Sequence, residues 1–514
     1  MSNLMKLRIS SARPALAAPL LALGLSVLLH ACGGGGGVGI NGTGSASDGV
    51  SVGTVTGFGS VFVDGLEFDD SQVAATLEEL SATSSAEIRL GQRIELGYDN
   101  GQSGARAVRS VSIMPALIGP VSAVNAAGGT LTVLGQSVSI NSDATLGPVT
   151  LFGAPYSALG DVKAADWVEI HAVQSASGWL ATRIDPRSTP ADLKTAPVRV
   201  TGQLSQLGAQ GFNVGSLAVR TSASTSVLPS GAVLANGQTV VVLAQLQDYS
   251  AAGTSLNAQR VRLQSRRSNA QQDDFLAGRI DDLSVSGGTT SFELDGVKVS
   301  YSGTAPAGLV EGAYVRVQGR FAGSEGESMT ASAIELRYGA GQAGGKVESI
   351  ELHGSIVGLG ATAGFPNRFQ VRDVVVDAGS LGAGQPDMSS CPHFSALADG
   401  LYVEVKGVNT AYGVQATSIS CKSEDGASVS GAIVELSGSF SALNPSGRRL
   451  LLTPAKGDPV TVQWSSSTFF RSPLQADGAD LAQRSGTLQI EGTFSGSGSS
   501  RVLQATKIKL KGSD

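Results

Sequence analysis

The chain has 514 residues, of which 15% are charged and 5% aromatic, and its formal net charge is −6. This length exceeds one ordinary domain of about 100–200 residues, so several domains are expected. A hydrophobic fraction of 41% excludes wholesale disorder. An acidic chain with few aromatic residues lacks the basic surface that binds a phosphate backbone, so no nucleic-acid partner is expected.

The N-terminus has the pattern of a secretory signal. Three basic residues precede an apolar run over residues 15–29, and no acidic residue comes before Asp48. The run is short for a transmembrane helix and is interrupted by Pro19 and Gly24. Residues 1–31 are therefore predicted to be a cleaved signal peptide.

The signal ends in Leu29-His30-Ala31-Cys32, which resembles the lipobox of bacterial lipoproteins. The resemblance implies that Cys32 carries the lipid and that the leader is cut before it. Gly33, where inner-membrane retention favours Asp, implies the outer membrane, on its periplasmic or surface-exposed face. An ordinary secreted protein with a chance cysteine is the alternative. Residues 32–49 form a Gly- and Ser-rich tether, which holds the folded body near the membrane.

A strand-forming phrase recurs along the rest of the chain. One copy is Gly312-Ala-Tyr-Val-Arg-Val-Gln-Gly319, in which apolar positions alternate between two glycines. A small-x-x-branched phrase such as Ala331 to Ile334 follows about twenty residues later, and repetition at this period predicts tandem small β domains. The first phrase begins at Gly91, Ala165, Gly237, Gly312, Gly400 and Gly486. The second phrase begins at Ala105, Ala181, Ala258, Ala331, Ala416 and Ala505.

The two phrases divide the chain into repeats, each of which reads as five short strands. In the second repeat, Thr130–Leu134 turns through Gly135-Gln136 into Ser137–Ile140, a hairpin with period-two alternation. About 75 residues bury only a small core, and closing five strands into a barrel also removes their edges. The predicted repeats cover residues 50–114, 115–190, 196–264, 274–338, 350–424 and 430–514.

The predicted fold is therefore all-β, a tandem array of about six small five-stranded barrels. The order of hairpin, connection and hairpin resembles the OB fold, in which a helix often fills the gap between the third and fourth strands. Residues 71–80 and 476–483 occupy this gap, and only residues 71–80 could hold a helix of about two turns. A β-sandwich in each repeat is the alternative topology. The strands are too short and too poor in aromatic residues for a membrane-spanning barrel.

The whole pattern resembles a known group of bacterial envelope lipoproteins. The features are the lipobox, the glycine tether, the opening Val55-Thr-Gly-Phe-Gly-Ser-Val-Phe-Val-Asp-Gly65 and the repeated phrases. The group is known only as a domain of unknown function, number fifty-six sixty-six. The resemblance covers nearly the whole mature chain and is strongest in the first, second, fourth and fifth repeats. It implies tandem OB-like barrels at the cell surface or in the periplasm, and it implies no activity.

Two cysteines remain if Cys32 is lipidated, and both lie in the fifth repeat. A Cys391–Cys421 disulfide is predicted; it would close a roughly 30-residue loop and contribute on the order of 3 kcal/mol in an oxidising compartment. A metal site that includes His393 is the alternative, but its fourth ligand is not identifiable. No cofactor and no metal are expected.

Aromatic residues recur at one position in the fourth strand. Trp167, Tyr314 and Tyr402 each directly precede the first inward-facing residue of that strand. OB barrels stack bases or sugars on exposed rings, so these residues are candidate ligand-facing aromatics for a carbohydrate or peptide. Packing of the rings on a neighbouring repeat is the alternative.

Carboxylates also recur in the fourth strand. Glu95, Glu169 and Glu404 occupy equivalent positions between inward-facing apolar residues, so alternation places them on the outer face. They are interpreted as solvated charges that discourage strand addition. A repeated acidic stripe for cations or a basic partner is the alternative, although Val241 and Arg316 interrupt it.

No catalytic constellation is evident. Gly49-Val-Ser51-Val-Gly53 spells a nucleophile elbow, but a tether precedes it and a strand follows it, so the required strand–turn–helix context is missing. The expected function is a non-enzymatic, lipid-anchored binding or structural array with an unknown protein or glycan partner. The alternative is a carbohydrate-active or hydrolytic enzyme with its site between two repeats. That alternative would require a joint with two carboxylates of raised pKa.

Overall fold

The computed structural model describes residues 47–510 apart from gaps. The gaps are residues 71–72, 81–82, 101–105, 144–145, 176–177, 253, 267, 269–271, 324–325, 339–349, 363, 373, 380–385, 387–396, 400, 411–412, 422–432, 455–458, 472–473 and 496–501. The predicted signal peptide, Cys32 and most of the tether lie outside the described residues. Within the described part, every helix is too short or too polar to cross a membrane.

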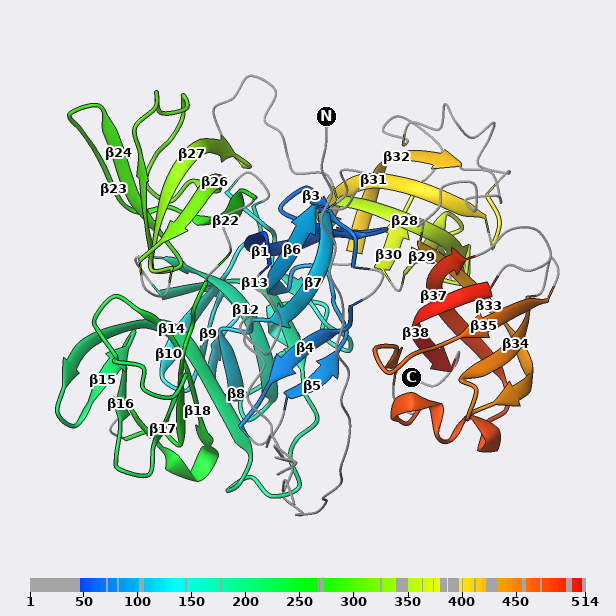
Figure 1. Ribbon diagram of the computed structural model, residues 1–514, viewed down its shortest axis with the longest axis horizontal. Helices are drawn as coiled ribbons and strands as arrows, with labels where there is room; N and C mark the ends of the chain where they lie inside the picture. The colour runs from blue at the N-terminus through cyan, green and yellow to red at the C-terminus, as the bar shows by residue number, and fades with distance from the viewer. Residues whose placement is uncertain are drawn as a thin grey trace, which may run out of the picture. The chain divides into compact units, whose positions relative to one another are not determined.

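A five-stranded barrel occupies residues 117–186 (Figure 1). Its elements are β8 (Leu117–Asn125), β9 (Thr130–Val133), β10 (Gln136–Ile140), the short β11 (Leu151–Phe152), the 3-10 turn η1 (Leu159–Asp161), β12 (Trp167–Ser175) and β13 (Gly178–Pro186). Antiparallel ladders join β8 to β9, β9 to β10 and β12 to β13. β10 runs parallel to β13, and β12 pairs back to β8. The ladder thus closes in an OB-like order, with its alternate apolar side chains in the core.

The same order of pairing recurs after residue 273. The first such set is β22 (Asp274–Arg279), β23 (Asp281–Ser286), β24 (Thr289–Leu294), β25 (Val297–Tyr301), β26 (Tyr314–Ala322) and β27 (Ser328–Leu336). The second is β28 (Ile350–Val357), β29 (Arg368–Val371), β30 (Val374–Asp377), β31 (Tyr402–Thr410) and β32 (Gly413–Cys421). The third is β33 (Ile433–Asn444), β34 (Arg449–Pro454), β35 (Val460–Gln463), β36 (Phe469–Phe470), η5 (Ala476–Gly478), η6 (Leu481–Gln483), β37 (Thr487–Ser495) and β38 (Val502–Leu510). In these sets β25 runs parallel to β27, β30 to β32 and β35 to β38.

Two further sets follow this order with irregular closing strands. The first is β1 (Gly49–Phe58), β2 (Val61–Val63), β3 (Leu66–Phe68), β4 (Ala75–Glu78), β5 (Thr83–Ala86), β6 (Arg93–Asn100) and β7 (Arg106–Ile113), closed by one bridge from Asp69 to Ala107. The second is β14 (Pro197–Gly208), β15 (Gly211–Val214), β16 (Leu217–Arg220), β17 (Ser226–Leu228), β18 (Thr239–Gln245), η2 (Leu246–Asp248), β19 (Tyr249–Ser250), β20 (Ser255–Asn257) and β21 (Arg260–Leu263). The predicted all-β fold of small OB-like barrels is confirmed, and the sandwich alternative is wrong because the ladders close.

Two local predictions need correction. Residues 75–78 form β4, which pairs with β5 and runs parallel to β7, rather than a helix. The reason is that Ala75 and Leu77 are buried with period two, which suits a strand on an open ladder. The hairpin turn in the second barrel is Leu134-Gly135, one residue earlier than predicted, because both residues have positive φ, at +48° and +73°.

The glycine that closes the strand-four phrase lies at a β-bulge. The register shifts at Gly319 in β26, at Gly407 in β31 and at Gly492 in β37. A Cβ on Gly407 would lie 2.3 Å from the carbonyl oxygen of Gln415 on the paired strand. The phrase therefore ends on glycine because the fifth strand crosses there too closely for a side chain.

Barrels also share short ladders through their first strands. β1 pairs in parallel with β22 over Ser51 and Val52, and with β28 over Gly57 and Phe58. β14 pairs with β8 over Arg199 and its neighbour Val200. Each barrel closes its own ladder, but barrels far apart in the sequence contact one another directly.

Candidate binding cleft and the contacts between barrels

Two hairpin turns carry the side chains that join the barrels of β1–β7 and β22–β27. Asp64 and Asp295 precede a turn glycine and have φ values of +45° and +47°, as a type I′ turn requires. Asp64 accepts a hydrogen bond from the Tyr314 hydroxyl at 2.8 Å, and Asp295 forms an ion pair with Arg93. Arg93 and Tyr314 begin the fourth strands of their barrels. The two barrels therefore exchange equivalent contacts, each turn binding the other's fourth strand.

This junction is buried and its donors are engaged. Arg93 is 4% exposed and also donates to the carbonyl oxygen of Ala277 at 2.9 Å and to Thr54 Oγ1 at 3.2 Å. Burial raises the pKa of Asp64, although Arg93 opposes the rise. Burial and the nearby Asp64 also hold the pKa of Tyr314 well above its usual value. Such a network favours a fixed contact between barrels over chemistry at neutral pH.

The three aromatic residues singled out from the sequence are buried. Trp167, Tyr314 and Tyr402 are 4%, 1% and 9% exposed. Tyr314 meets the ring of Tyr338 edge-on, with centroids 5.2 Å apart. Trp167 packs in the apolar core formed by residues of β8–β21, and Tyr402 packs with the core residues of β34–β38. Their burial favours packing rather than a ring presented to a ligand, because neighbouring strands cover the outer face at this position.

The interpretation of the strand-four carboxylates as solvated charges is wrong for two of them. Glu95 and Glu169 are 4% and 7% exposed, because other barrels cover the outer faces of β6 and β12. Arg266 lies 3.3 Å from Glu95, and Arg187 lies 2.7 Å from Glu169. Only Glu404 is half-buried. These carboxylates are used inside the molecule and form no continuous acidic stripe.

One buried cluster has the ligand types of a metal site, namely Glu169, His171 and Asp185. His171 Nδ1 accepts the backbone N–H of Arg93 at 3.1 Å, and its Nε2 lies 2.9 Å from Glu169. Arg183 donates to both oxygens of Asp185 at 2.7 Å. Protein groups therefore already bind the atoms that a metal would need, and arginine supplies the positive charge.

A second cluster of this kind is half-buried and lies on β28 and β31. Its members are Glu351, His353 and Glu404, whose ligand atoms lie within 4.8 Å of one another. The Lys406 ammonium lies 3.2 Å from Glu404 and 3.8 Å from Glu351. Its hydrogen bond to Glu404 and the charge of Glu351 raise the pKa of Lys406. The lysine therefore takes the place of a cation between these carboxylates.

The cysteine predictions fall largely outside the described residues. Cys32, Cys391 and His393 all lie outside the described residues. Cys421 ends β32 and is half-buried against the apolar core. The Cys391–Cys421 disulfide and the lipid on Cys32 stay predictions.

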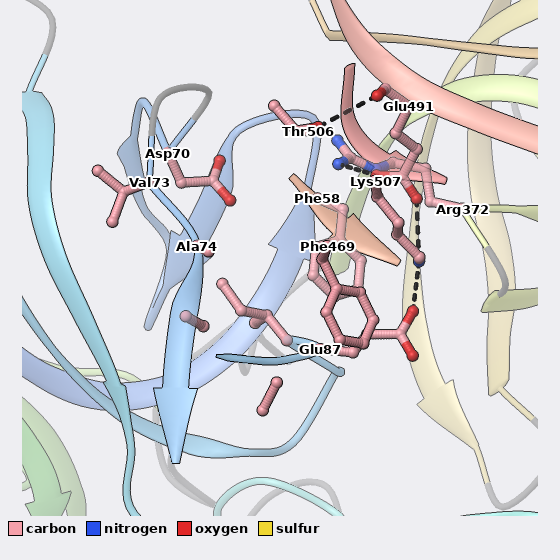
Figure 2. Close-up of a pocket in the computed structure, with 13 residues that line it drawn as sticks. Phe58, Asp70, Val73, Ala74, Glu87, Arg372, Phe469, Glu491, Thr506 and Lys507 are labelled. Carbon is pink, nitrogen blue, oxygen red and sulfur yellow. Dashed lines mark hydrogen bonds and ion pairs between the residues drawn. The ribbon is translucent and has the colours of Figure 1, made fainter. Parts of the chain in front are cut away.

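A polar cleft opens where β3–β5, the β29 turn and β36–β38 meet (Figure 2). It encloses about 600 Å³, counted with the solvent-filled space at its mouth. Asp70, Val73 and Ala74, between β3 and β4, line one wall, and residues of β36–β38 line another. The lining residues are Phe58, Asp70, Val73, Ala74, Ala75, Ala86, Glu87, Ile88, Arg372, Phe469, Glu491, Thr506 and Lys507.

A chain of ion pairs crosses one side of the cleft. Lys507 binds Glu87 and lies 3.0 Å from Glu491, to which Arg372 also donates at 2.6 Å (Figure 2). Burial alone would raise the pKa of Glu87, but Lys507 and Arg89 outweigh it and lower that pKa to about 2. In the same way, Arg372 and Lys507 lower the pKa of Glu491 in spite of its burial. These groups are ionised and paired across the physiological pH range.

Asp70 differs from the other charged groups of the cleft. One of its oxygens, Oδ1, accepts the backbone N–H of Val61 at 3.1 Å. Burial raises the pKa of Asp70 to about 6, although Arg372 opposes the rise. In Figure 2 its carboxylate lies across the cleft from Lys507 and Arg372. Asp70 is thus a titratable group at the cleft that changes charge near neutral pH.

Sequence reasoning missed Asp70 and Arg372. Asp70 lies two residues after the end of β3, where an acidic residue looks like an ordinary loop residue. Arg372 stands at the hairpin-turn position that Asp64 and Asp295 occupy in other barrels, with φ of +52°. The equivalent turn positions in the repeats could have pointed to Arg372 as a contact residue. They do not reveal which other barrel each turn contacts.

One segment of the chain resembles a known protein family. Residues 118–185 match a family model described as Domain of unknown function (DUF5666). The second barrel is thus similar to this family model. The match spans β8 to β13 almost completely, so it confirms the resemblance in that segment. No curated protein matches the chain. A solved structure titled drosophila Unr CSD456 shares 12% identity, over 43% of this chain and 97% of that chain, with a TM-score of 0.12.

Proposed function

We propose that the protein is a non-enzymatic, lipid-anchored protein of the bacterial cell envelope, held at the outer membrane. In this proposal its joined barrels form one body that binds a ligand in the cleft at Asp70. The observation that carries the proposal is the cleft itself, which combines paired charges, apolar walls and one titratable carboxylate at a meeting point of barrels. A rigid set of barrels presents such a site without needing moving parts.

A hydrolase is the second candidate, and one observation favours it. Asp70 has a raised pKa while Glu87 and Glu491 are ionised, as general acid catalysis beside a second carboxylate requires. Against it, Glu87 and Glu491 are each held by cations, with side chains 9% and 8% exposed. A carboxylate held in this way is poorly placed to attack a sugar or to activate water.

Binding is tested by closing the cleft. Ala74 lines it without joining the ion pairs, so Ala74→Phe fills the space and leaves the charges intact. In a thermal-shift screen of soluble envelope metabolites and oligosaccharides, a cleft ligand raises the Tm of the full-length protein and has no effect on Ala74→Phe. Ala126→Phe, at an exposed turn residue, is the matched control and should respond like the wild type. Equal shifts in wild type and Ala74→Phe would contradict the proposal.

Turnover is tested separately with purified peptidoglycan and envelope polysaccharides. The proposal predicts no release of new reducing ends by the full-length protein. Release that disappears in Asp70→Asn would replace the binding proposal with the hydrolase.

A further inference from the structure

We propose that the ligand of the cleft is a small organic cation, an alkylammonium ion whose charge is neutralised by the Asp70 carboxylate. This inference rests on the proposed function, because it names the chemical class that the same cleft would bind.

The charges of the cleft favour a cation. Three carboxylates and two cations are among its lining residues. Lys507 and Arg372 are already directed at Glu87 and Glu491. Asp70 lines the cleft and receives the Val61 N–H on Oδ1, and the hydrogen bonds found in the described residues leave Oδ2 as an acceptor. An incoming ammonium would therefore meet an acceptor, whereas an incoming carboxylate would meet a like charge.

Desolvation adds to this preference. Asp70 is half-buried and has lost part of its hydration, which raises the pKa of its carboxyl group. A cation that binds at short range replaces the lost water and stabilises the ionised form, as charge-assisted hydrogen bonds do. A neutral hydroxyl group at the same place would contribute only an ordinary hydrogen bond.

The apolar part of the lining matches a short alkyl chain. Phe58, Phe469, Val73 and Ile88 line the cleft beside the charged groups. Figure 2 shows the rings of Phe58 and Phe469 beside the Glu87–Lys507 ion pair. Aliphatic carbons pack on such rings, and a ring face also attracts a cation. A short alkylammonium ion can therefore place its charge at Asp70 and its methylene groups against the apolar residues.

Binding should then depend on pH through Asp70. The charged groups that act on it are Arg372, Glu491 and Asp69, and Glu87 and Lys507 line the same cleft. Glu87 has a pKa of about 2 and Glu491 is likewise lowered, so neither changes charge above pH 5. With the Asp70 pKa at about 6, only about a tenth of it is ionised at pH 5, and affinity should fall about tenfold from pH 7.5.

The test is calorimetric titration of the full-length protein in detergent. The salt concentration is about 150 mM, which is close to physiological ionic strength. The probes are pentane-1,5-diamine and its neutral isostere pentane-1,5-diol. We expect the diamine to bind at least tenfold more tightly than the diol at pH 7.5. Asp70→Asn should weaken diamine binding at least tenfold, because the asparagine side chain keeps the shape of aspartate but carries no charge. Glu67→Gln removes an exposed charge of the same barrel and should change nothing.

The outcomes separate this inference from the function on which it rests. Equal binding of diol and diamine, abolished by Ala74→Phe, would overturn the cation and leave the binding cleft standing. Diamine binding that survives both Asp70→Asn and Ala74→Phe would place the ligand elsewhere and overturn both. Absence of diamine binding to the wild type would overturn the inference.

Discussion

At the scale of one residue, burial makes the ionised Asp70 carboxylate unfavourable in the folded state, and a bound cation would offset this free-energy cost. Its pKa of about 6 lies above the ordinary value of 3.8, so the folded state holds the proton more tightly than the unfolded chain. The penalty for folding is full above about pH 6, shrinks as the pH falls, and is gone below about pH 4. Ligand binding and stability are therefore linked through the same carboxylate.

Asp70→Asn is expected to stabilise the protein without ligand. Removing the buried charge should raise the free energy of unfolding by about 1–2 kcal/mol at pH 7.5, since Asp70 is only partly buried and water screens part of the penalty. At pH 3.5 the gain should vanish, because wild-type Asp70 is then protonated in both states. Urea unfolding at the two pH values measures this difference. A gain of equal size at both would show that the charge is not its cause.

Single residues were predictable from the sequence only where the backbone dictates them. The closing glycines of the strand-four phrase follow from local geometry and lie where the pattern indicated. The partners of Asp64 and Asp295 were not predictable, because alternation assigns a side chain to the outer face without saying what covers it. The same limit explains why Glu95 and Glu169 looked solvated and are buried.

At the scale of elements, the first strands of the barrels perform two tasks. β1 closes its own barrel through β2 and β6, and it also forms short parallel ladders with β22 and β28. Period-two alternation found the strands that line each core. It missed the β4–β5 hairpin because Thr83-Ser84-Ser85-Ala86 has no apolar alternation. That hairpin carries the chain into Glu87, so the cleft was hidden with it.

Gly57 tests the contact between β1 and β28. A Cβ at this position would lie 2.3 Å from the carbonyl oxygen of Glu351, a backbone atom that cannot rotate away. Gly57→Ala should therefore lower the free energy of unfolding by about 1–3 kcal/mol through forced separation of the strands. Gly160→Ala, with no atom within 4 Å of its added Cβ, is the matched control. Equal urea midpoints for the two variants would contradict the close approach of β1 and β28.

At the scale of the whole molecule, a predicted lipid anchor holds a body of barrels that contact one another. The anchor depends on Cys32, which lies outside the described residues. Cells that express the protein should incorporate a fatty-acid analogue into the wild type and not into Cys32→Ala, because only the thiol accepts the lipid. Cys421→Ala serves as the control and should label like the wild type. Equal labelling of Cys32→Ala would end the lipoprotein proposal.

The sequence predicted the all-β fold of small barrels, because the strand-forming phrases recur along the chain. It did not predict that barrels distant in the chain would bind through buried charges such as Arg93 and Asp295. Those contacts depend on three-dimensional packing, to which a repeat pattern contributes no information. The cleft exists only where barrels meet, so the proposed function depends on their being joined.

Scanning calorimetry of the full-length protein tests this joining most directly. Arg93→Met removes one partner of a buried ion pair and leaves Asp295 uncompensated, at a cost of about 3–5 kcal/mol. If the barrels are joined, this variant lowers the melting transition of the barrel that contains Asp295 as well as that of its own barrel. The account would be contradicted if the wild type melted in separate transitions and Arg93→Met shifted only the one that contains β6.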